Sequence, residues 1–113
     1  VRHEEVYRSS FAISVCPSEN VESPTIVGAQ AANELLNIIG IKASFVLTEY
    51  NDKIYISSRS IDEINVQIIM EKLGGGGHLN VAGAQLEGVT IVQAKRMIQD
   101  TLDEMLKEGD IEE

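Results

Sequence analysis

Apolar residues recur at every second position from Phe11 to Val15, with small residues between them. This period is typical of a β-strand. We therefore expect a first strand from about Val6 to Cys16, preceded by a polar lead-in over residues 1–5. The passage from Pro17 to Glu22 is rich in turn-forming residues and ends this strand.

A helical period follows. Ser23 is a suitable N-cap and Pro24 suits the first helical position, so we expect a helix from Pro24 to Ile39 that Gly40 terminates. Its apolar positions recur at helical spacing; they are Val27, Ala31, Leu35 and Ile38. Small residues near its start would let that end approach a sheet closely; they are Gly28, Ala29, Ala31 and Ala32.

Two further strands and a tight turn come next. Ala43 to Tyr50 is dense in β-favouring residues and predicts a strand, and Lys53 to Ser58 predicts another. Asn51 and Asp52 between them tolerate the backbone angles of a tight turn. We expect the two strands to pair as a hairpin.

Ser60 and Glu63 have the spacing of a capping box, which predicts the start of a second helix. This helix has a broad apolar face and ends at the consecutive glycines Gly74 to Gly77. The apolar residues are Ile61, Ile64, Val66, Ile68, Ile69, Met70 and Leu73. We expect the helix to be well buried.

The remainder of the chain predicts one more strand and one more helix. Leu79 to Ala82 could form a turn of helix or a loop, and Gly83 to Glu87 a short strand. Thr90 to Gln93 repeats the capping-box pattern, and the last helix runs to about Lys107, followed by Gly109. Its expected buried stripe is Ile91, Ala94, Ile98, Leu102 and Met105.

The predicted order is β-α-β-β-α-β-α, which indicates an α/β (α+β) fold with a small mixed sheet and helices packed against it. With 113 residues, of which 43% are hydrophobic, the chain suits a single domain over residues 1–113, including an acidic tail at 109–113. It has no apolar run of bilayer length and no secretory signal, which indicates a cytoplasmic location. Because residue 1 is valine, we expect a longer parent protein, whose upstream part could include a membrane anchor.

Charge and cysteine content narrow the function. A formal net charge of −9 argues against a surface that follows a long nucleic acid, because such binding depends on Lys and Arg. A small phosphorylated ligand in a local pocket remains compatible with this charge. The lone Cys16 suits a reducing compartment, and we expect it to be a small buried hydrophobic residue rather than a nucleophile.

The run from Gly74 to Gly77 is followed by His78, one of two histidines in the chain. Each glycine costs conformational entropy on folding, so a run of them needs a reason. Successive glycine amides can turn toward one point and bind an anion such as phosphate. We favour this interpretation over a flexible linker or an extended helix cap. The spacing excludes the dinucleotide fingerprint and the phosphate loop of nucleotide triphosphatases.

A second candidate for anion binding is the end of the third strand. Ser58 and Arg59 precede the predicted helix start, where free amides and a guanidinium group favour an anion. A solvated arginine and a plain helix cap are equally compatible. His78 has no second histidine or carboxylate cluster nearby in sequence, so we expect a ligand contact rather than a catalyst, and no metal site in this chain. Asn65 could brace the neighbouring loop.

Several of these segments together resemble the DHH-associated domain, the C-terminal half of the DHH phosphoesterases. The matching segments are Ile56-Ser57-Ser58-Arg59-Ser60, Ile64-Asn65-Val66, Gly74-Gly75-Gly76-Gly77-His78 and Ala82-Gly83-Ala84. The resemblance covers nearly the whole chain, and its specific part is the glycine-histidine core. The chain departs from the family at Val81, where alanine is usual.

The resemblance implies that catalysis and substrate binding reside in two different domains. An upstream DHH domain would hold paired manganese ions and perform hydrolysis, and this chain would face it across a cleft. The resemblance further implies that Gly75, Gly76, Gly77 and His78 bind the substrate's phosphate or nucleotide, with Ser58 and Arg59 holding the same ligand. Without the metal-binding half, the isolated chain would be inactive.

Within the family, the segment from Ile64 to Leu86 is most similar to membrane-anchored bacterial cyclic di-AMP phosphodiesterases. The expected ligand is therefore a cyclic or linear dinucleotide. An oligoribonuclease that also removes the 3′ phosphate of adenosine bisphosphate is the second candidate, and a single-strand exonuclease the third. Two further hypotheses give the chain no part in hydrolysis. In one it is a module that senses a nucleotide, and in the other it is a module that forms a homodimer and uses the glycines as a hinge.

Overall fold

The computed structural model describes residues 3–16, 24–61 and 63–112. In chain order the elements are β1 (His3–Tyr7), β2 (Phe11–Cys16), α1 (Pro24–Leu35), β3 (Ala43–Tyr50), β4 (Lys53–Ser60), α2 (Val66–Lys72), β5 (Gly76–Gly77), β6 (Val81–Glu87) and α3 (Ile91–Glu108). The predicted α/β class with a mixed sheet is confirmed. The predicted turn passage Pro17–Glu22 and the Ser23 cap lie outside the described residues.

The strands form one six-stranded sheet in the order β1-β2-β3-β4-β6-β5. β2 and β3 are parallel and are joined through α1, while the other neighbouring pairs are antiparallel. Since parallel strands need a crossover connection, α1 lies against one face of the sheet. The glycine strand β5 and the N-terminal strand β1 therefore occupy opposite edges.

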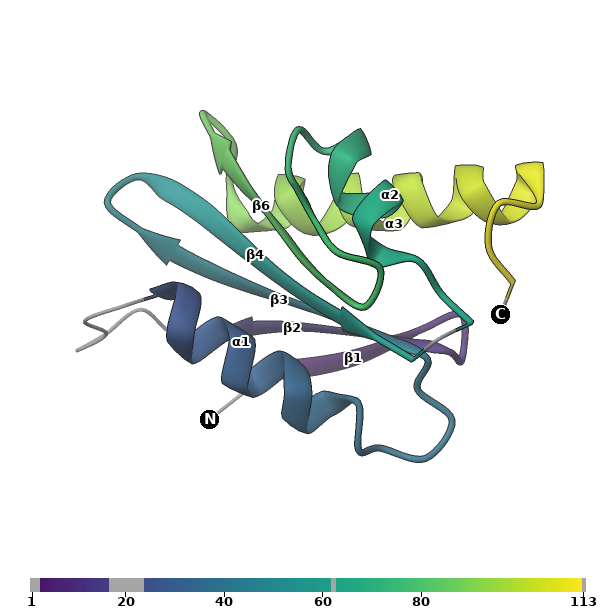
Figure 1. Ribbon diagram of the computed structural model, residues 1–113. Coiled ribbons are helices and arrows are strands. Elements are labelled where there is room, and N and C mark those ends of the chain that lie inside the picture. The colour runs from purple at the N-terminus through teal and green to yellow at the C-terminus, as the bar shows by residue number, and fades with distance from the viewer. Residues whose placement is uncertain (1–2, 17–23, 62, 113) are drawn as a thin grey trace.

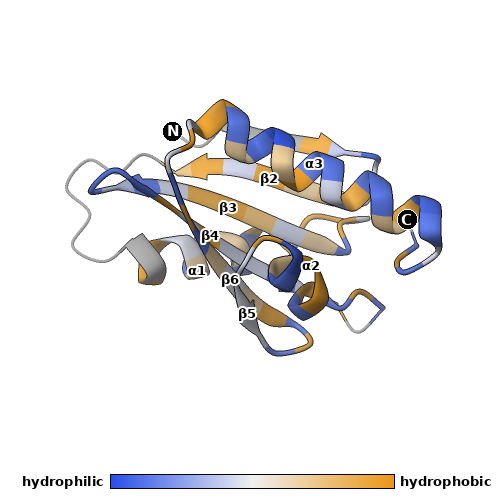
Figure 2. Cartoon of the chain, turned by 90° about the horizontal axis from the view of Figure 1, so that it is seen from above, coloured by the Kyte–Doolittle hydropathy of each residue, from blue (hydrophilic) through white to orange (hydrophobic). Residues whose placement is uncertain are grey.

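Helices cover both faces of the sheet: α1 packs on one side, and α2 and α3 on the other (Figure 1). Seen from the second side, α3 crosses over β2 and β3 while α2 lies beside β6 (Figure 2). The larger core fills this side and includes Phe11, Phe45, Ile56, Ile69, Met70, Ile98, Leu102 and Met105. The smaller core under α1 contains Ala12, Cys16, Ala31, Ala32, Leu35, Ile41 and Val46. None of the described helices is long and apolar enough to cross a bilayer.

The small residues of α1 allow the close helix–sheet approach that we predicted. A Cβ atom built on Gly28 would lie 2.7 Å from the Ser57 hydroxyl oxygen, so a larger residue there would have to displace that hydroxyl. Ser44 donates a 2.7 Å hydrogen bond to the Ala32 carbonyl beneath the same helix. α1 ends at Leu35 rather than at the predicted Ile39, and the chain leaves it through a series of turns.

The first strand was predicted as one piece but is a hairpin. β1 and β2 pair antiparallel, so residues 3–5 belong to the sheet rather than to a polar lead-in. Arg8 and Ser9 make the turn with φ of 51° and 59°. Glycine or asparagine usually marks such a turn, and neither is present here.

The predicted hairpin of β3 and β4 is confirmed. Its strands pair from Ala43–Ser60 to Tyr50–Lys53. Asn51 and Asp52 form the turn with φ of 52° and 63°, as their side chains favour. β4 extends two residues beyond the predicted end at Ser58.

The predicted start of the second helix at Ser60 is wrong. Asn65 is the N-cap, and its side chain accepts hydrogen bonds from the amides of Gln67 and Ile68. Ser60 is the last residue of β4, and its hydroxyl donates to the Ile64 carbonyl at 2.6 Å. The capping-box spacing at Ser60 therefore coincides with a strand end, and α2 has only seven residues.

The last helix follows the prediction closely. Thr90 and the side chain of Gln93 form both hydrogen bonds of a capping box. Gly109 ends the helix in the left-handed conformation at φ 81°. The predicted stripe is buried at Ala94, Ile98, Leu102 and Met105, while Ile91 is half-buried.

The glycine run begins as a helix cap and continues as a strand. Gly74, with φ 87°, donates to the Glu71 carbonyl, and Gly75 donates to the Met70 carbonyl at 2.8 Å. These two bonds are the Schellman pattern that ends a helix. Gly76 then pairs with Gly83 of β6. The predicted strand from Gly83 starts earlier, at Val81, and gains this glycine strand as an edge partner.

Close packing against β6 explains two of the glycines. A Cβ atom on Gly75 would lie 2.1 Å from the Gly83 carbonyl oxygen, and one on Gly77 would lie 2.5 Å from the Val81 carbonyl oxygen. Both obstacles are backbone atoms, which cannot rotate away. By contrast, a Cβ atom on Gly76 would meet nothing within 4 Å.

A polar cluster links the β1–β2 turn to α3. The Tyr7 hydroxyl donates to the Asp103 carboxylate at 2.7 Å, and Arg8 Nε donates to it at 2.6 Å. These bonds lower the pKa of Asp103, mainly through the Tyr7 hydrogen bond. The same hydrogen bond raises the pKa of Tyr7.

The glycine packing predicts unequal effects within the run. We expect Gly75→Ala to lower the free energy of unfolding by about 2 kcal/mol, because its methyl group would overlap backbone. Gly76→Ala should be neutral or stabilising by up to about 1 kcal/mol, since it restricts only the unfolded chain. Urea denaturation of the two variants checks this, and equal destabilisation by both would contradict the described packing.

The polar cluster predicts a pH dependence of stability. Folding lowers the pKa of Asp103, so the ionised carboxylate stabilises the folded state. This stabilisation is fully present above the ordinary pKa of a carboxyl group, and it disappears as the pH falls through the pKa of Asp103 in the folded protein. We expect Asp103→Asn to cost roughly 0.5 kcal/mol near neutral pH, as is usual for exposed pairs, and less in acid. Denaturation at several pH values, with Asp100→Asn on the same helix as control, measures this. A cost that does not change with pH would exclude the mechanism.

Candidate functional site

A pocket of about 590 Å³ lies on the α1 side of the sheet, over β4, β6 and β5. It is lined by Ala29, Tyr55, Ile56, Ser57, Arg59, Gly74, Gly75, Gly76, Gly77, His78, Val81, Ala82, Gly83, Ala84 and Gln85. The glycine run, Arg59 and His78 are thus brought to one place. The helix between them does not hold them apart, because the run folds back and pairs with β6.

Strand register and missing side chains create this hollow. Ser57 pairs with Gly83, and Gly83 pairs with Gly76, so one row across three strands carries a single side chain. The next row toward the sheet end is Arg59, Val81 and His78. α1 contacts β2, β3 and β4, which leaves the outer strands of this face open.

Arg59 is half-buried at the pocket wall. Its Nη1 atom donates to the Ser58 carbonyl at 2.8 Å, and no described carboxylate pairs with it. Partial burial lowers the pKa of Arg59 from its ordinary value, but an arginine stays protonated near neutral pH. The remaining guanidinium donors are available to an anion, preferably one with two oxygens in a plane.

His78 is exposed and stands at the start of a tight turn. Its backbone amide donates to the Val81 carbonyl at 2.7 Å, and the Val81 amide donates back at 3.3 Å. Asn80 in the turn donates to the Ser60 hydroxyl at 3.1 Å and to the Ile61 carbonyl at 3.0 Å. These bonds fix the turn to the end of β4, beside Arg59.

The backbone of the glycine run offers a further donor. His78 and Val81 exchange both of their hydrogen bonds, so in an antiparallel ladder the next pair, Gly77 and Ala82, is a non-hydrogen-bonded pair. The Gly77 amide therefore lies on the free edge of the sheet. Gly74 and Gly75 already donate to α2 carbonyls, so the run presents fewer free amides than an open anion-binding loop.

Ser58 does not line the pocket. Side chains alternate along a strand, and Ser58 lies with Ile54 and Ile56 on the α2–α3 face. It is 0% exposed, and its hydroxyl has no hydrogen-bond partner among the described groups. Ser57, on the other face, lines the pocket instead.

Three of the lining residues were not proposed from the sequence as part of a binding site. Tyr55 and Gln85 form a cross-strand pair at one end of the pocket, and Ala29 of α1 forms part of the wall. Strand alternation from Arg59 reaches Ser57 and Tyr55, and this signal was available in the sequence. The pairing of β4 with β6, which adds Gln85, is a long-range property.

No metal centre is found in the described part of the chain, where no three His, Cys, Asp or Glu side chains come together. His78 therefore belongs to no such group there. The chemistry that these residues can supply is hydrogen bonding and positive charge from Arg59. This combination suits the binding of an anion.

Solved structures share the fold. An exopolyphosphatase-related protein from Bacteroides fragilis aligns with a TM-score of 0.78 and 23% identity, over 90% of this chain and 31% of that one. The C-Ala domain of alanyl-tRNA synthetase from Aquifex aeolicus aligns with a TM-score of 0.67 and 19% identity, over 88% of this chain and 97% of that one. At these identities the likeness shows the fold alone.

Curated relatives are closer in sequence. The cyclic-di-AMP phosphodiesterase PdeA of Listeria monocytogenes is 47% identical over 88% of this chain, and the cyclic-di-AMP phosphodiesterase GdpP of Bacillus subtilis is 37% identical over 96% of it. The bifunctional oligoribonuclease and PAP phosphatase NrnA of Thermus thermophilus is 35% identical over 62%. The chain spans 15% of PdeA and 17% of GdpP. The DHHA1 domain model matches residues 9–108, and the chain therefore belongs to the DHHA1 domain family.

Proposed function

We propose that this chain is the substrate-binding domain of a DHH-type phosphodiesterase that hydrolyses cyclic di-AMP or a short linear dinucleotide. The observation that carries the proposal is the pocket in which Arg59, His78 and the glycine run meet. The names of the relatives PdeA and GdpP support the choice of a cyclic dinucleotide.

In this proposal the chain binds and orients the ligand. Arg59 would hold a phosphate through its planar fork, and His78 and the Gly77 amide would donate to the same group. Ser57, rather than Ser58, would add a hydroxyl from the pocket floor, since only Ser57 faces the pocket. Gly76 would let the ligand approach the backbone closely, and Gly75 would hold this segment against β6.

The cleavage itself is assigned to a partner domain. Paired manganese ions on an upstream DHH domain would supply an activated water for hydrolysis. The described residues here offer no cluster of ligands for such ions. In this proposal the residues of this chain hold the ligand and take no part in breaking its bonds.

A second candidate function within the family is that of an oligoribonuclease with 3′-phosphoadenosine phosphatase activity. The similarity to NrnA favours it, although that match covers a smaller part of the chain. A nucleotide-sensing module is the candidate from another class. It would use the same pocket, but its parent protein would lack the Asp-His-His motif.

The pocket predicts that Arg59 is needed for substrate binding. In the protein that joins this chain to its DHH domain, we expect Arg59→Ala to lower kcat/KM for cyclic di-AMP by about tenfold to a hundredfold, because a charged hydrogen bond is lost. His78→Ala should lower it about fivefold to tenfold. Arg96→Ala, an exposed arginine on α3, is the matched control. Wild-type kinetics in both pocket variants would refute the assignment.

The isolated chain should bind without cleaving. We expect the 113-residue chain to leave cyclic di-AMP intact in the presence of Mn²⁺, as followed by chromatography of the nucleotides. Amide NMR with cyclic di-AMP, linear pApA and inorganic phosphate then locates the contacts. Metal-dependent hydrolysis by the pure chain would mean that a catalytic site is present in it.

A further inference from the structure

Tyr55 and Gln85 form the end of the pocket that is farthest from Arg59. They are direct cross-strand partners on β4 and β6, so their Cβ atoms lie about 5 Å apart. Tyr55 precedes Arg59 by four residues on the same face of β4, which is about 13 Å at 3.3 Å per residue. The two ends of the pocket can therefore hold different parts of one nucleotide.

This end of the pocket differs in chemistry from the Arg59 end. Among the described lining residues, Arg59 is the one with a permanent charge. Tyr55 is half-buried and Gln85 is exposed, and neither side chain is hydrogen-bonded to another described residue. In the next cross-strand pair, Lys53 and Glu87 form an ion pair with each other at 3.5 Å. Neither residue lines the pocket.

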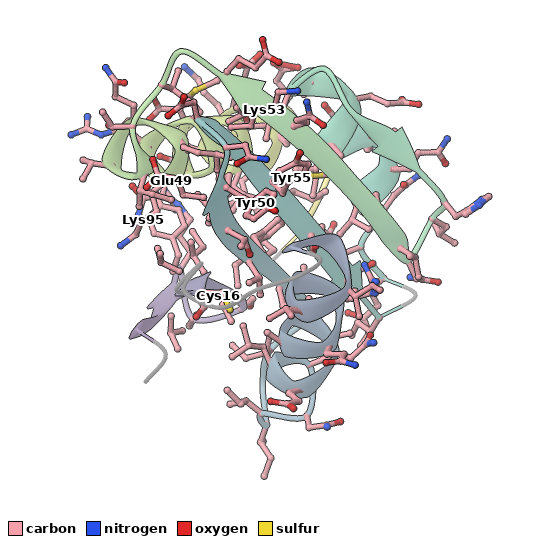
Figure 3. The ribbon with its side chains drawn as sticks, turned by 90° about the vertical axis from the view of Figure 1, so that its left-hand side faces the viewer. Cys16, Glu49, Tyr50, Lys53, Tyr55 and Lys95 are labelled. Atoms are coloured by element: carbon pink, nitrogen blue, oxygen red, sulfur yellow. The ribbon has the colours of Figure 1, made fainter. Side chains whose placement is uncertain are left out.

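Figure 3 looks onto the sheet end where β3 turns into β4 and labels Tyr55 together with Lys53 and Tyr50. On the pocket side Tyr55 lies between Thr48 of β3 and Gln85 of β6 in the register. Thr48 is fully buried, whereas Gln85 is exposed. Of these two cross-strand neighbours of Tyr55, Gln85 is thus the one that a ligand can reach.

We propose that Tyr55 and Gln85 form a nucleobase subsite that selects adenine over guanine. This inference rests on the proposed function, in which the Arg59 end of the same pocket holds the phosphate. A base stacks on the Tyr55 ring, as bases do on aromatic side chains of nucleic-acid-binding proteins. The Gln85 amide reads the edge of that base.

The preference for adenine follows from matching donors to acceptors. A glutamine amide presents one donor group and one acceptor side by side, which complements the N6 amino group and N7 of adenine. The corresponding edge of guanine presents two acceptors, O6 and N7, and one of them would face the amide oxygen. Arginine, which has two parallel donors, complements guanine instead.

The test compares two substrates in the protein that joins this chain to its DHH domain. We expect wild-type kcat/KM for cyclic di-AMP to exceed that for cyclic di-GMP by about tenfold or more. Gln85→Ala and Gln85→Glu should remove most of this preference, and Gln85→Arg should shift the ratio toward guanine. Tyr55→Leu should lower kcat/KM for both substrates by about fivefold or more, and by more than Tyr55→Phe does, because only phenylalanine keeps a ring for stacking.

Controls separate the possible failures. Gln67→Ala removes a glutamine from α2, outside the pocket, and should leave the substrate ratio unchanged. If the wild-type enzyme cleaves cyclic di-AMP but no Gln85 variant changes the ratio of kcat/KM between the two substrates, the base subsite alone is overturned. A wild-type enzyme that cleaves neither dinucleotide would overturn the proposed function and the subsite with it. Thermal melting of each variant verifies that the fold is intact.

Discussion

The fit of the glycine strand against β6 is the constraint on which the site depends. Gly75 and Gly77 approach the β6 backbone so closely that no side chain fits between them. This approach brings a segment that leaves α2 back to the sheet, and it places His78 in the row of Arg59. Without it, the helix end and the strand end would lie at separate places on the surface.

The glycines therefore act through packing as well as through flexibility. A run of glycines suggests an open loop whose amides all face one ligand. Here the amides of Gly74 and Gly75 cap α2, and Gly76 and Gly77 pair with β6. What the run contributes to the pocket is mostly the absence of side chains, which continues across the sheet at Gly83. An anion approaching this surface meets backbone and the guanidinium group of Arg59.

Local signals in the sequence predicted much of the fold. Asn51 and Asp52 are residues that favour tight turns, and Thr90 and Gln93 have the spacing of a capping box. The hairpin and the helix beside these residues were therefore predicted correctly. The β1–β2 turn was missed because Arg8 and Ser9 adopt left-handed angles without the usual residues. The start of α2 was misplaced because the capping-box spacing at Ser60 also occurs at a strand end.

The pocket itself could be predicted only in part. Arg59, His78 and the glycines were recognised as chemically suitable, but their meeting depends on the pairing of β6 with both β4 and β5. Ser58 and Ser57 are adjacent in sequence and lie on opposite faces, so the choice between them needed the register of the buried residues. Gln85 has no local signal, because its partner Tyr55 lies thirty residues earlier.

The turn that carries His78 has a consequence for the thermodynamics of ligand binding. Asn80 fastens this turn to Ser60 and Ile61, and the turn closes on itself through Val81. A ligand that binds here meets a preorganised backbone, so little conformational entropy is lost on association. Its affinity then reflects mainly desolvation and contacts, and binding should leave the backbone order of this edge nearly unchanged.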